Sequence, residues 1–257
     1  MESSNVFGRN ENAALNSRTF QKVAGAKYKE AMTIRGTINK IAILLIIVVI
    51  SAAGAWLAVA HDMESGWLIP WLLLTSGSAF VVGMITCIEM KLAPFTATLY
   101  AFLEGSVLGG ISAFFEAEYP GLVIQAVFLT FGTLLGLLVV YRASGFRVTT
   151  RFRVGVISAT FAILLVYAAN IFLQVLGLGG LPFIHQTGLT GIGFSLFVVG
   201  IAALNLVLDI DLIESGARQG APKYMEWYSA FGLMVTLIWL YLEVLELLAK
   251  IAASNDD

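Results

Sequence analysis

Length, composition and charge place this chain outside the soluble globular proteins. Of its 257 residues, 58% are hydrophobic and only 12% are charged, and the formal net charge is -2. A typical soluble domain is about 45–50% apolar and about 25% charged, so a soluble core could not bury this much apolar side chain. No basic face is left to bind nucleic acid. The single cysteine, Cys87, lies in an apolar run and excludes an intramolecular disulfide.

Residues 1–40 differ in character from the rest of the chain. They contain serine, asparagine, glycine and alternating charges with little periodicity, which predicts a largely disordered cytoplasmic tail. They lack the short apolar segment and cleavage site of a secretory signal peptide, so we expect the first span to act as its own targeting signal. The end of the tail, Tyr28–Lys40, could form a short interfacial helix. We divide the remainder into a membrane domain over 41–251 and a short acidic tail over 252–257.

Seven apolar runs follow the tail, each long enough to cross about 30 Å of hydrocarbon at about 1.5 Å per residue of helix. The connections between them are too short to hold a soluble domain. The sequence therefore predicts an all-α integral membrane protein, a bundle of seven transmembrane helices. The predicted spans are Ile41–Ala60, Trp67–Ile88, Ala93–Phe115, Gly121–Tyr141, Val154–Gly177, Gly188–Asp209 and Trp227–Ala249.

Charges in the connections predict the orientation, because cytoplasmic loops collect lysine and arginine. Basic residues precede the first span and fall in alternate connections, whereas acidic residues lie in the others. We therefore expect a cytoplasmic amino terminus and a carboxyl terminus on the outside. The basic set is Arg9, Arg18, Lys22, Lys27, Lys29, Arg35, Lys40, Lys91, Arg142, Arg147, Arg151, Arg153, Arg218 and Lys223, and the acidic set is Asp62, Glu64, Glu116 and Glu118.

Small residues four apart recur in two of the runs. Gly105 and Gly109 lie in the third run, and Gly132 and Gly136 lie in the fourth. In lipid such pairs let helix backbones approach closely, so we expect both pairs to mark helix contacts. Glycines and a proline over 177–182 predict a flexible outer loop between the fifth and sixth spans.

Ionisable side chains inside a bilayer are costly and rare, so each is a candidate functional residue. Here they are all acids: Glu104 in the third run, Asp209 and Asp211 at the end of the sixth, and Glu243 and Glu246 in the seventh. We expect no lysine or arginine to lie deep enough to neutralise them. These carboxyls either hold protons, share protons with one another, or face a hydrated cation path.

Helical periodicity groups these acids with neighbouring amides. Asn205 and Asp209 are four apart and share a face, which we expect to point inward, with Asp211 nearer the cytoplasmic mouth. Glu243 and Glu246 also share a face, and Asn170 with Gln174 forms a polar strip on the fifth helix. The alternative for Asp211 and Glu246 is a position at the membrane boundary, in contact with solvent.

Patterns typical of enzymes are absent, so we expect a protein that is not an enzyme and carries no cofactor. Only two histidines occur, His61 and His185, both in predicted outer loops, which excludes a three-histidine metal site. Ser195 only faintly resembles a serine nucleophile turn. No fixed metal site is predicted, although calcium could bind transiently at Asp209 and Glu243.

Three segments, Ala101–Gly105, Leu208–Ile213 and Leu240–Glu243, resemble the transmembrane Bax inhibitor-1 motif family. The segment Gly220–Tyr228 and the long polar tail are similar to a bacterial branch of that family. The resemblance covers about the last two-thirds of the chain. It implies a location in the bacterial inner membrane.

The resemblance also implies a central seventh helix ringed by six others and a pH-sensitive calcium leak governed by an acidic pair. The pair corresponds to Asp209, at the end of the sixth helix, and to Glu243, which follows Leu240–Leu242 in the seventh. The connection between these helices looks longer than the resemblance leads us to expect.

Three functions remain open on the sequence. The first is a proton-regulated cation leak, with calcium ions or protons as its partners, since carboxylate oxygens suit a hard divalent ion. The second is a non-conducting regulator or scaffold that binds a membrane protease or another membrane complex. The third is a secondary transporter for another solute, although no inverted repeat or pair of broken helices is evident.

Overall fold

The structure, a computed structural model, describes residues 31–61, 66–144 and 148–256. The predicted cytoplasmic tail up to residue 30 lies outside these ranges. So do Asp62, Glu64 and Arg147, which contributed to the predicted orientation. No strand occurs within the described ranges, and the chain is helical along most of them.

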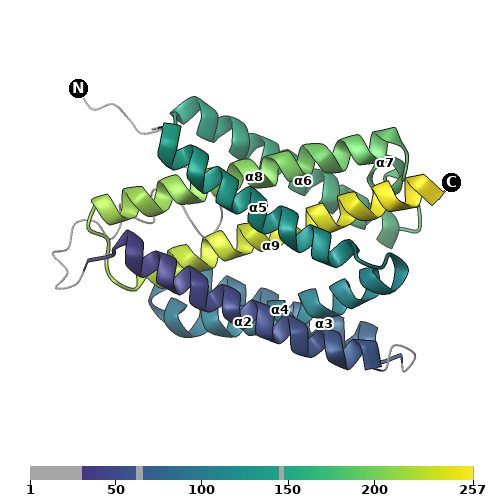
Figure 1. Cartoon of the computed structure of the whole chain (residues 1–257), viewed down its shortest axis with the longest axis horizontal. Coiled ribbons are helices and arrows are strands. Elements are labelled where there is room, and N and C mark those ends of the chain that lie inside the picture. Colours follow the sequence, from purple (N-terminus) through teal and green to yellow (C-terminus); the bar gives the residue numbers. More distant parts are fainter. Residues whose placement is uncertain (1–30, 62–65, 145–147, 257) are drawn as a thin grey trace. The chain divides into compact units, whose positions relative to one another are not determined.

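The predicted all-α membrane fold is confirmed. In the part of the chain that the structure describes, seven helices are long and apolar enough to span a membrane; Figure 1 shows their arrangement along the chain. The 3-10 turn η1 (Met90–Leu92) leads into the third of them, and the short helix α7 (Pro182–His185) precedes the sixth. The seven are α2 (Ile34–His61), α3 (Leu68–Ile88), α4 (Ala93–Glu118), α5 (Leu122–Ser144), α6 (Thr150–Val175), α8 (Leu189–Arg218) and α9 (Met225–Asp256).

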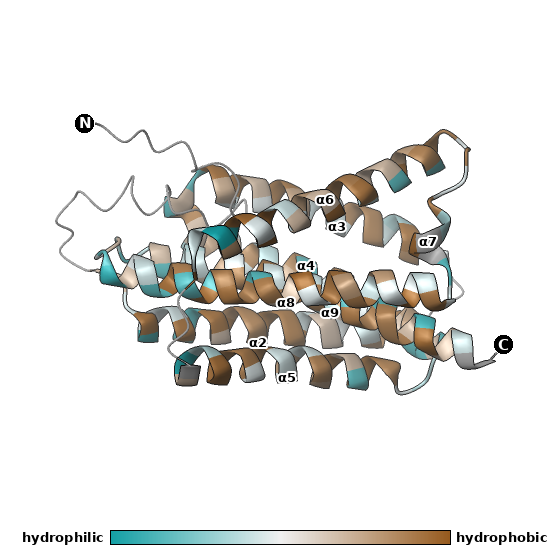
Figure 2. Cartoon of the chain, turned by 90° about the horizontal axis from the view of Figure 1, so that it is seen from above, coloured by the Kyte–Doolittle hydropathy of each residue, from teal (hydrophilic) through white to brown (hydrophobic). Residues whose placement is uncertain are grey.

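Large apolar side chains on the outside of these helices explain why the chain needs lipid. Figure 2 shows hydrophobic residues along most of the length of the helices. Leu73, Phe128 and Val175 are 70%, 72% and 79% exposed. In water such surfaces would drive aggregation, whereas in a bilayer they face hydrocarbon. The chain is therefore an integral membrane protein.

Three helices, α2, α8 and α9, extend well beyond their predicted ends, and α9 continues past Ala249 to Asp256. α2 begins at Ile34, not Ile41, so residues 34–40 belong to the first span and the separate interfacial helix expected over Tyr28–Lys40 is wrong there. α8 continues past Asp209 to Arg218, where the i,i+4 pair of Glu214 and Arg218 is 3.6 Å apart. The long connection between the last two spans is thus largely helical.

The chain folds into two compact units, each built from two separate stretches of sequence. Of the described residues, those up to Phe114 and those over Asp209–Val235 form unit 1, and those over Phe115–Leu208 and from Thr236 onward form unit 2. α9 contributes its first part to unit 1 and its second part to unit 2. It also has the largest buried share of the seven candidate spans, 61% of its window.

In unit 1, α4 packs closely on α2 through the predicted glycine pair. A Cβ on Gly105 would lie 2.6 Å from the carbonyl oxygen of Val48, and one on Gly109 would overlap the carbonyl oxygen of Ala52. Beside them, the Ser51 and Ser106 hydroxyls are 2.7 Å apart. The predicted helix contact at Gly105 and Gly109 is therefore confirmed.

The second glycine pair, on α5 in unit 2, behaves differently. A Cβ added to Gly132 or Gly136 would meet no atom within 4 Å. The prediction of a close helix contact there is wrong within this chain. Two glycines four residues apart lie on one face of a helix whether that face contacts another helix or lipid. Their spacing alone therefore does not predict a helix contact.

Unit 2 joins α6, α8 and the second part of α9 through polar contacts. Asn205 on α8 donates its Nδ2–H to Thr160 Oγ1 on α6 at 2.7 Å. The connection after α6 turns at Gly177 and Gly179, whose φ angles of +70° and +75° lie in the left-handed region. Asn170 Oδ1 accepts a hydrogen bond from the Leu181 backbone at 2.7 Å and so holds this connection against α6.

Candidate functional site

Glu243 is a buried carboxylate in the part of α9 that belongs to unit 2, and it is 5% exposed. Tyr167 Oη, from α6, lies 2.9 Å from its Oε1 and 3.0 Å from its Oε2. Trp239 Nε1, one turn earlier on α9, donates to Oε1 at 2.9 Å. Phe194 on α8 packs edge-on against the Tyr167 ring with 6.2 Å between ring centroids. Three helices thus set the position of this carboxyl group.

The donors around Glu243 suit a group that gains and loses a proton. Tyrosine hydroxyl is both a donor and an acceptor, whereas indole N–H only donates. When Glu243 is ionised, Tyr167 and Trp239 donate to it. When Glu243 is protonated, its own O–H can donate to Tyr167 Oη across the same distance. Neither protonation state requires α6 and α9 to separate.

Glu246, one turn further along α9, has a different partner. Lys250 Nζ lies 2.7 Å from Glu246 Oε1 and donates to Ser195 Oγ of α8 at 2.7 Å. Lys250 is itself buried, at 6% exposed. The expectation that no basic side chain would be embedded beside the acids is therefore wrong for Glu246. The seventh span was predicted to end at Ala249, one residue before Lys250, whereas α9 continues to Asp256.

The two amides predicted beside the acids make structural contacts. Asn205 is 6% exposed and, besides Thr160, donates to the Ile201 carbonyl oxygen at 2.9 Å. Asn170 is also 6% exposed and accepts from Leu181. A Cβ on Gly180 would meet Asn170 Oδ1 at 2.6 Å and Gln174 Nε2 at 2.9 Å. The predicted polar strip on α6 thus lies against the connection that follows it.

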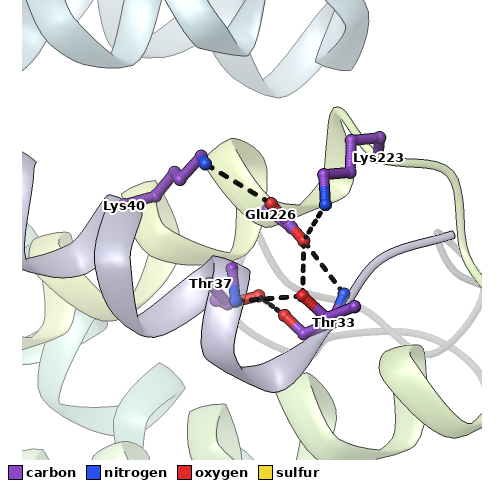
Figure 3. Close-up of polar contacts among 6 residues, drawn as sticks. Thr33, Thr37, Lys40, Lys223 and Glu226 are labelled. Carbon is purple, nitrogen blue, oxygen red and sulfur yellow. Dashed lines mark hydrogen bonds and ion pairs between the residues drawn. The ribbon is translucent and has the colours of Figure 1, made fainter. Parts of the chain in front are cut away.

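A second polar cluster, which the sequence did not indicate, lies in unit 1 at the start of α9 (Figure 3). Glu226 is fully buried, and its Oε1 accepts from the Thr33 backbone N–H and the Thr33 hydroxyl, each at 3.0 Å. Lys223 Nζ lies 3.0 Å from Oε1, and Lys40 Nζ lies 3.6 Å from Oε2. We call these four residues the Glu226 clasp.

The Glu226 clasp joins the beginnings of two spans. Thr33 precedes α2, and its hydroxyl accepts from the Gly36 N–H at 3.0 Å, as an N-cap does. The carboxylate therefore sits at the positive end of the α2 dipole. A Cβ on Gly36 would overlap the Glu226 carboxylate, so a larger residue there would have to displace that carboxylate. A backbone bond from Met32 N–H to the Ala221 carbonyl oxygen, 2.6 Å, reinforces the junction.

Two signals in the sequence could have pointed to the Glu226 clasp. Glu226 is an acid in the first turn of a helix, where it complements the dipole, and Lys223 stands three residues before it. The partners Thr33 and Lys40 are more than 180 residues away in the sequence, and no local pattern could have supplied them.

No group of three or more histidine, cysteine or acidic side chains in the described ranges could hold a metal ion. Over residues 12–253, the chain matches the protein family described as Bax inhibitor 1 like. The chain belongs to this family. Comparisons with curated proteins and with solved structures find no match.

The acids that the family resemblance singled out fall in both units of this Bax inhibitor 1-like protein. Asp209 on α8 is 1% exposed and belongs to unit 1, whereas Glu243 belongs to unit 2. Asp211 on α8 and Glu104 on α4, both in unit 1, are partly exposed. The described contacts of unit 2 bring Glu243 together with Tyr167 and Trp239.

Proposed function

We propose that this Bax inhibitor 1-like protein conducts a proton-regulated cation leak, with calcium as the expected ion. Membership of the family supports the proposal. The observation that carries it is the setting of Glu243, a buried carboxyl in a membrane-spanning helix whose hydrogen-bond donors, Tyr167 and Trp239, are neutral. A buried acid whose hydrogen-bond donors are neutral responds to protons because no cation is hydrogen-bonded to it, although Lys250 attracts its ionised form from a longer distance.

In this proposal Glu243 and Asp209 are the acids that sense protons. Both are buried, and a change in the charge of either alters the electrostatic free energy of a low-dielectric interior. Carboxylate oxygens are also suitable ligands for calcium in transit. Secondary candidates for supporting roles are Glu104 and Asp211 in unit 1 and Asn170, Asn205 and Glu246 in unit 2. No catalytic step is assigned to the chain.

The proposal places the protein in a bacterial inner membrane with its amino terminus in the cytoplasm and its carboxyl terminus outside. Basic residues in the connections next to α4, α6 and α9 support this orientation. The leak would then carry cations into the cytoplasm, down their gradient.

Flux through the purified protein in liposomes tests the proposal. Calcium entry is measured across a pH series for the wild type, Asp209→Asn, Glu243→Gln and the double mutant, with the exposed Glu118→Gln as matched control. We expect the two single mutants to change the pH dependence and Glu118→Gln to leave it unchanged. Sodium and potassium flux in the same liposomes gives the selectivity. Wild-type flux and pH response in both single mutants would contradict the proposal.

A second function is favoured by a different observation. Glu246 pairs with Lys250, and Lys250 donates a hydrogen bond to Ser195, so one acid of α9 holds the lysine that fastens α9 to α8. If the other acids serve the same purpose, the protein is a non-conducting regulator or scaffold that binds a membrane protease or another membrane complex. No flux of any cation through folded wild-type protein would favour this alternative.

A further inference from the structure

Lys250 is unusual among the basic residues of the chain. Of the lysines and arginines in the described ranges, it alone is buried. It also lies inside a helix that is apolar enough to span the membrane. A buried ammonium is costly unless it is paired and hydrogen-bonded, so its partners are the reason it is tolerated.

Those partners are oxygen atoms of the kind that bind metal cations. Glu246 Oε1 and Ser195 Oγ each lie 2.7 Å from Lys250 Nζ. Carboxylate and hydroxyl oxygens are also ligands for hard cations such as calcium. The ammonium group thus occupies a position where a free cation would otherwise find a carboxylate.

The side chains of Glu246 and Lys250 differ in their exposure at the surface of α9. The Glu246 side chain is 36% exposed, whereas the Lys250 side chain is 7% exposed. A cation that approaches from the surface therefore reaches the carboxylate first, with the ammonium already bound behind it. Because like charges at such short range repel strongly in a medium of low dielectric, the ammonium opposes binding of a second cation.

We propose that Lys250 is a built-in counter-ion that occupies the Glu246 carboxylate and excludes free cations from this part of α9. Its effect on flux rests on the proposed leak, but its effect on cation binding does not. The pairing of Lys250 with Glu246 also gives different roles to Glu243 and Glu246, two acids on one face of α9. Glu243 is left to respond to protons, whereas Glu246 is held by a fixed positive charge.

Terbium, a luminescent substitute for calcium, tests the proposal in purified protein. Trp239 lies two turns before Glu246 on α9, about 10 Å along the axis at about 1.5 Å per residue, and serves as the sensitiser. Terbium emission excited through tryptophan is titrated for the wild type, Lys250→Met and Lys250→Arg. We expect Lys250→Met to bind terbium about tenfold more tightly or better, with calcium competing, because a charge has been removed at contact distance. Lys250→Arg keeps the charge and should behave as the wild type does.

Two further variants keep the test decisive. Lys250→Gln retains a hydrogen bond to Ser195, so it replaces Lys250→Met if the methionine variant does not fold. Glu246→Gln combined with Lys250→Met lacks both charges, and we expect it to lose the gain in terbium affinity. Equal terbium binding by folded wild type, Lys250→Met and Lys250→Gln overturns the proposal, as does a gain that persists without Glu246.

Calcium flux in the same variants separates this proposal from the leak itself. If the wild type conducts, we expect Lys250→Met to raise the rate about threefold or more, since entry near a neutralised charge becomes easier. A terbium gain without flux in any variant overturns the leak but supports the role of Lys250. Flux in the wild type without a terbium gain in Lys250→Met overturns the role of Lys250 but supports the leak.

Discussion

One hydroxyl serves both oxygens of the buried carboxylate: Tyr167 Oη lies 2.9 Å from Glu243 Oε1 and 3.0 Å from Oε2. The two residues are 76 positions apart in the sequence and come from different spans, α6 and α9. This contact makes the charge state of a carboxyl on α9 depend on the position of α6. Any movement between these helices within unit 2 therefore changes the environment of Glu243.

Tyr167→Phe removes this hydroxyl and nothing else. We expect the free energy of unfolding to fall by about 1–3 kcal/mol, because a buried carboxyl group loses a hydrogen-bond partner. The pH dependence of calcium flux should also change. Thermal unfolding in detergent and flux in liposomes provide the measurements. Tyr119→Phe, in the turn after α4, is the control and should alter neither.

Trp239→Phe tests the second donor to Glu243. It removes one bond of 2.9 Å to Oε1 and leaves both contacts with Tyr167 in place. We expect a smaller loss of stability than in Tyr167→Phe, about 0.5–1.5 kcal/mol, in the same unfolding assay. A larger loss in Trp239→Phe would show that packing of the indole, and not its hydrogen bond, supports this part of α9.

The glycines of α4 and α5 provide a matched pair of substitutions. Gly109→Leu should destabilise the fold by at least about 1–3 kcal/mol, because its side chain would have to displace the α2 backbone at Ala52. Gly132→Leu, on the open face of α5, should leave the melting temperature nearly unchanged. Similar melting of the two variants would contradict the close packing of α4 on α2.

Hydropathy and charge were sufficient to predict the spans. The apolar runs predicted all seven candidate membrane helices, because the need to satisfy backbone hydrogen bonds in lipid leaves few alternatives to helix. The ends of the helices were less predictable. Residues 34–40 and 210–218 are polar enough to resemble connections, yet they continue α2 and α8, since helix can extend into the interface.

The candidate site could be predicted only in part. An acid in an apolar run is visible in the sequence, so Glu243 and Glu246 were identified. Tyr167, the partner of Glu243, and Ser195, the partner of Lys250, lie on other helices, and no local spacing shows which faces meet. Lys250 was missed because the predicted seventh span ended one residue before it, at Ala249, whereas α9 continues to Asp256 and buries the lysine.

Orientation in the membrane is a prediction that labelling can test. In a Cys87→Ala background, Arg151→Cys in the first turn of α6 and Ser254→Cys near the end of α9 report on opposite ends of these helices. An impermeant thiol reagent added to intact cells should label Ser254→Cys only, because basic connections stay in the cytoplasm. Labelling of Arg151→Cys alone would invert the orientation, and labelling of both would mean that one of the last three spans does not cross.

The Glu226 clasp leads to the last prediction. Glu226→Gln removes the negative charge and leaves Lys40 and Lys223 without it, so we expect the free energy of unfolding to fall by about 1–3 kcal/mol. The backbone amides of 31–36 should exchange hydrogen faster, since the Thr33 N–H loses a charged acceptor.

Gly36→Ala should have the same effect without removing any charge, because the added methyl group overlaps the Glu226 carboxylate and must displace it. Glu214→Gln is the control. It breaks an exposed pair with Arg218 on α8, and pairs of that kind contribute about 0–1 kcal/mol.

Hydrogen exchange followed by mass spectrometry and thermal unfolding measure all three variants. If Gly36→Ala exchanges as slowly as the wild type while Glu226→Gln exchanges faster, the loss in Glu226→Gln reflects unpaired lysines and not separation of α2 from α9. Faster exchange in both variants, with Glu214→Gln unchanged, would mean that the position of the carboxylate itself holds the beginning of α2 against α9.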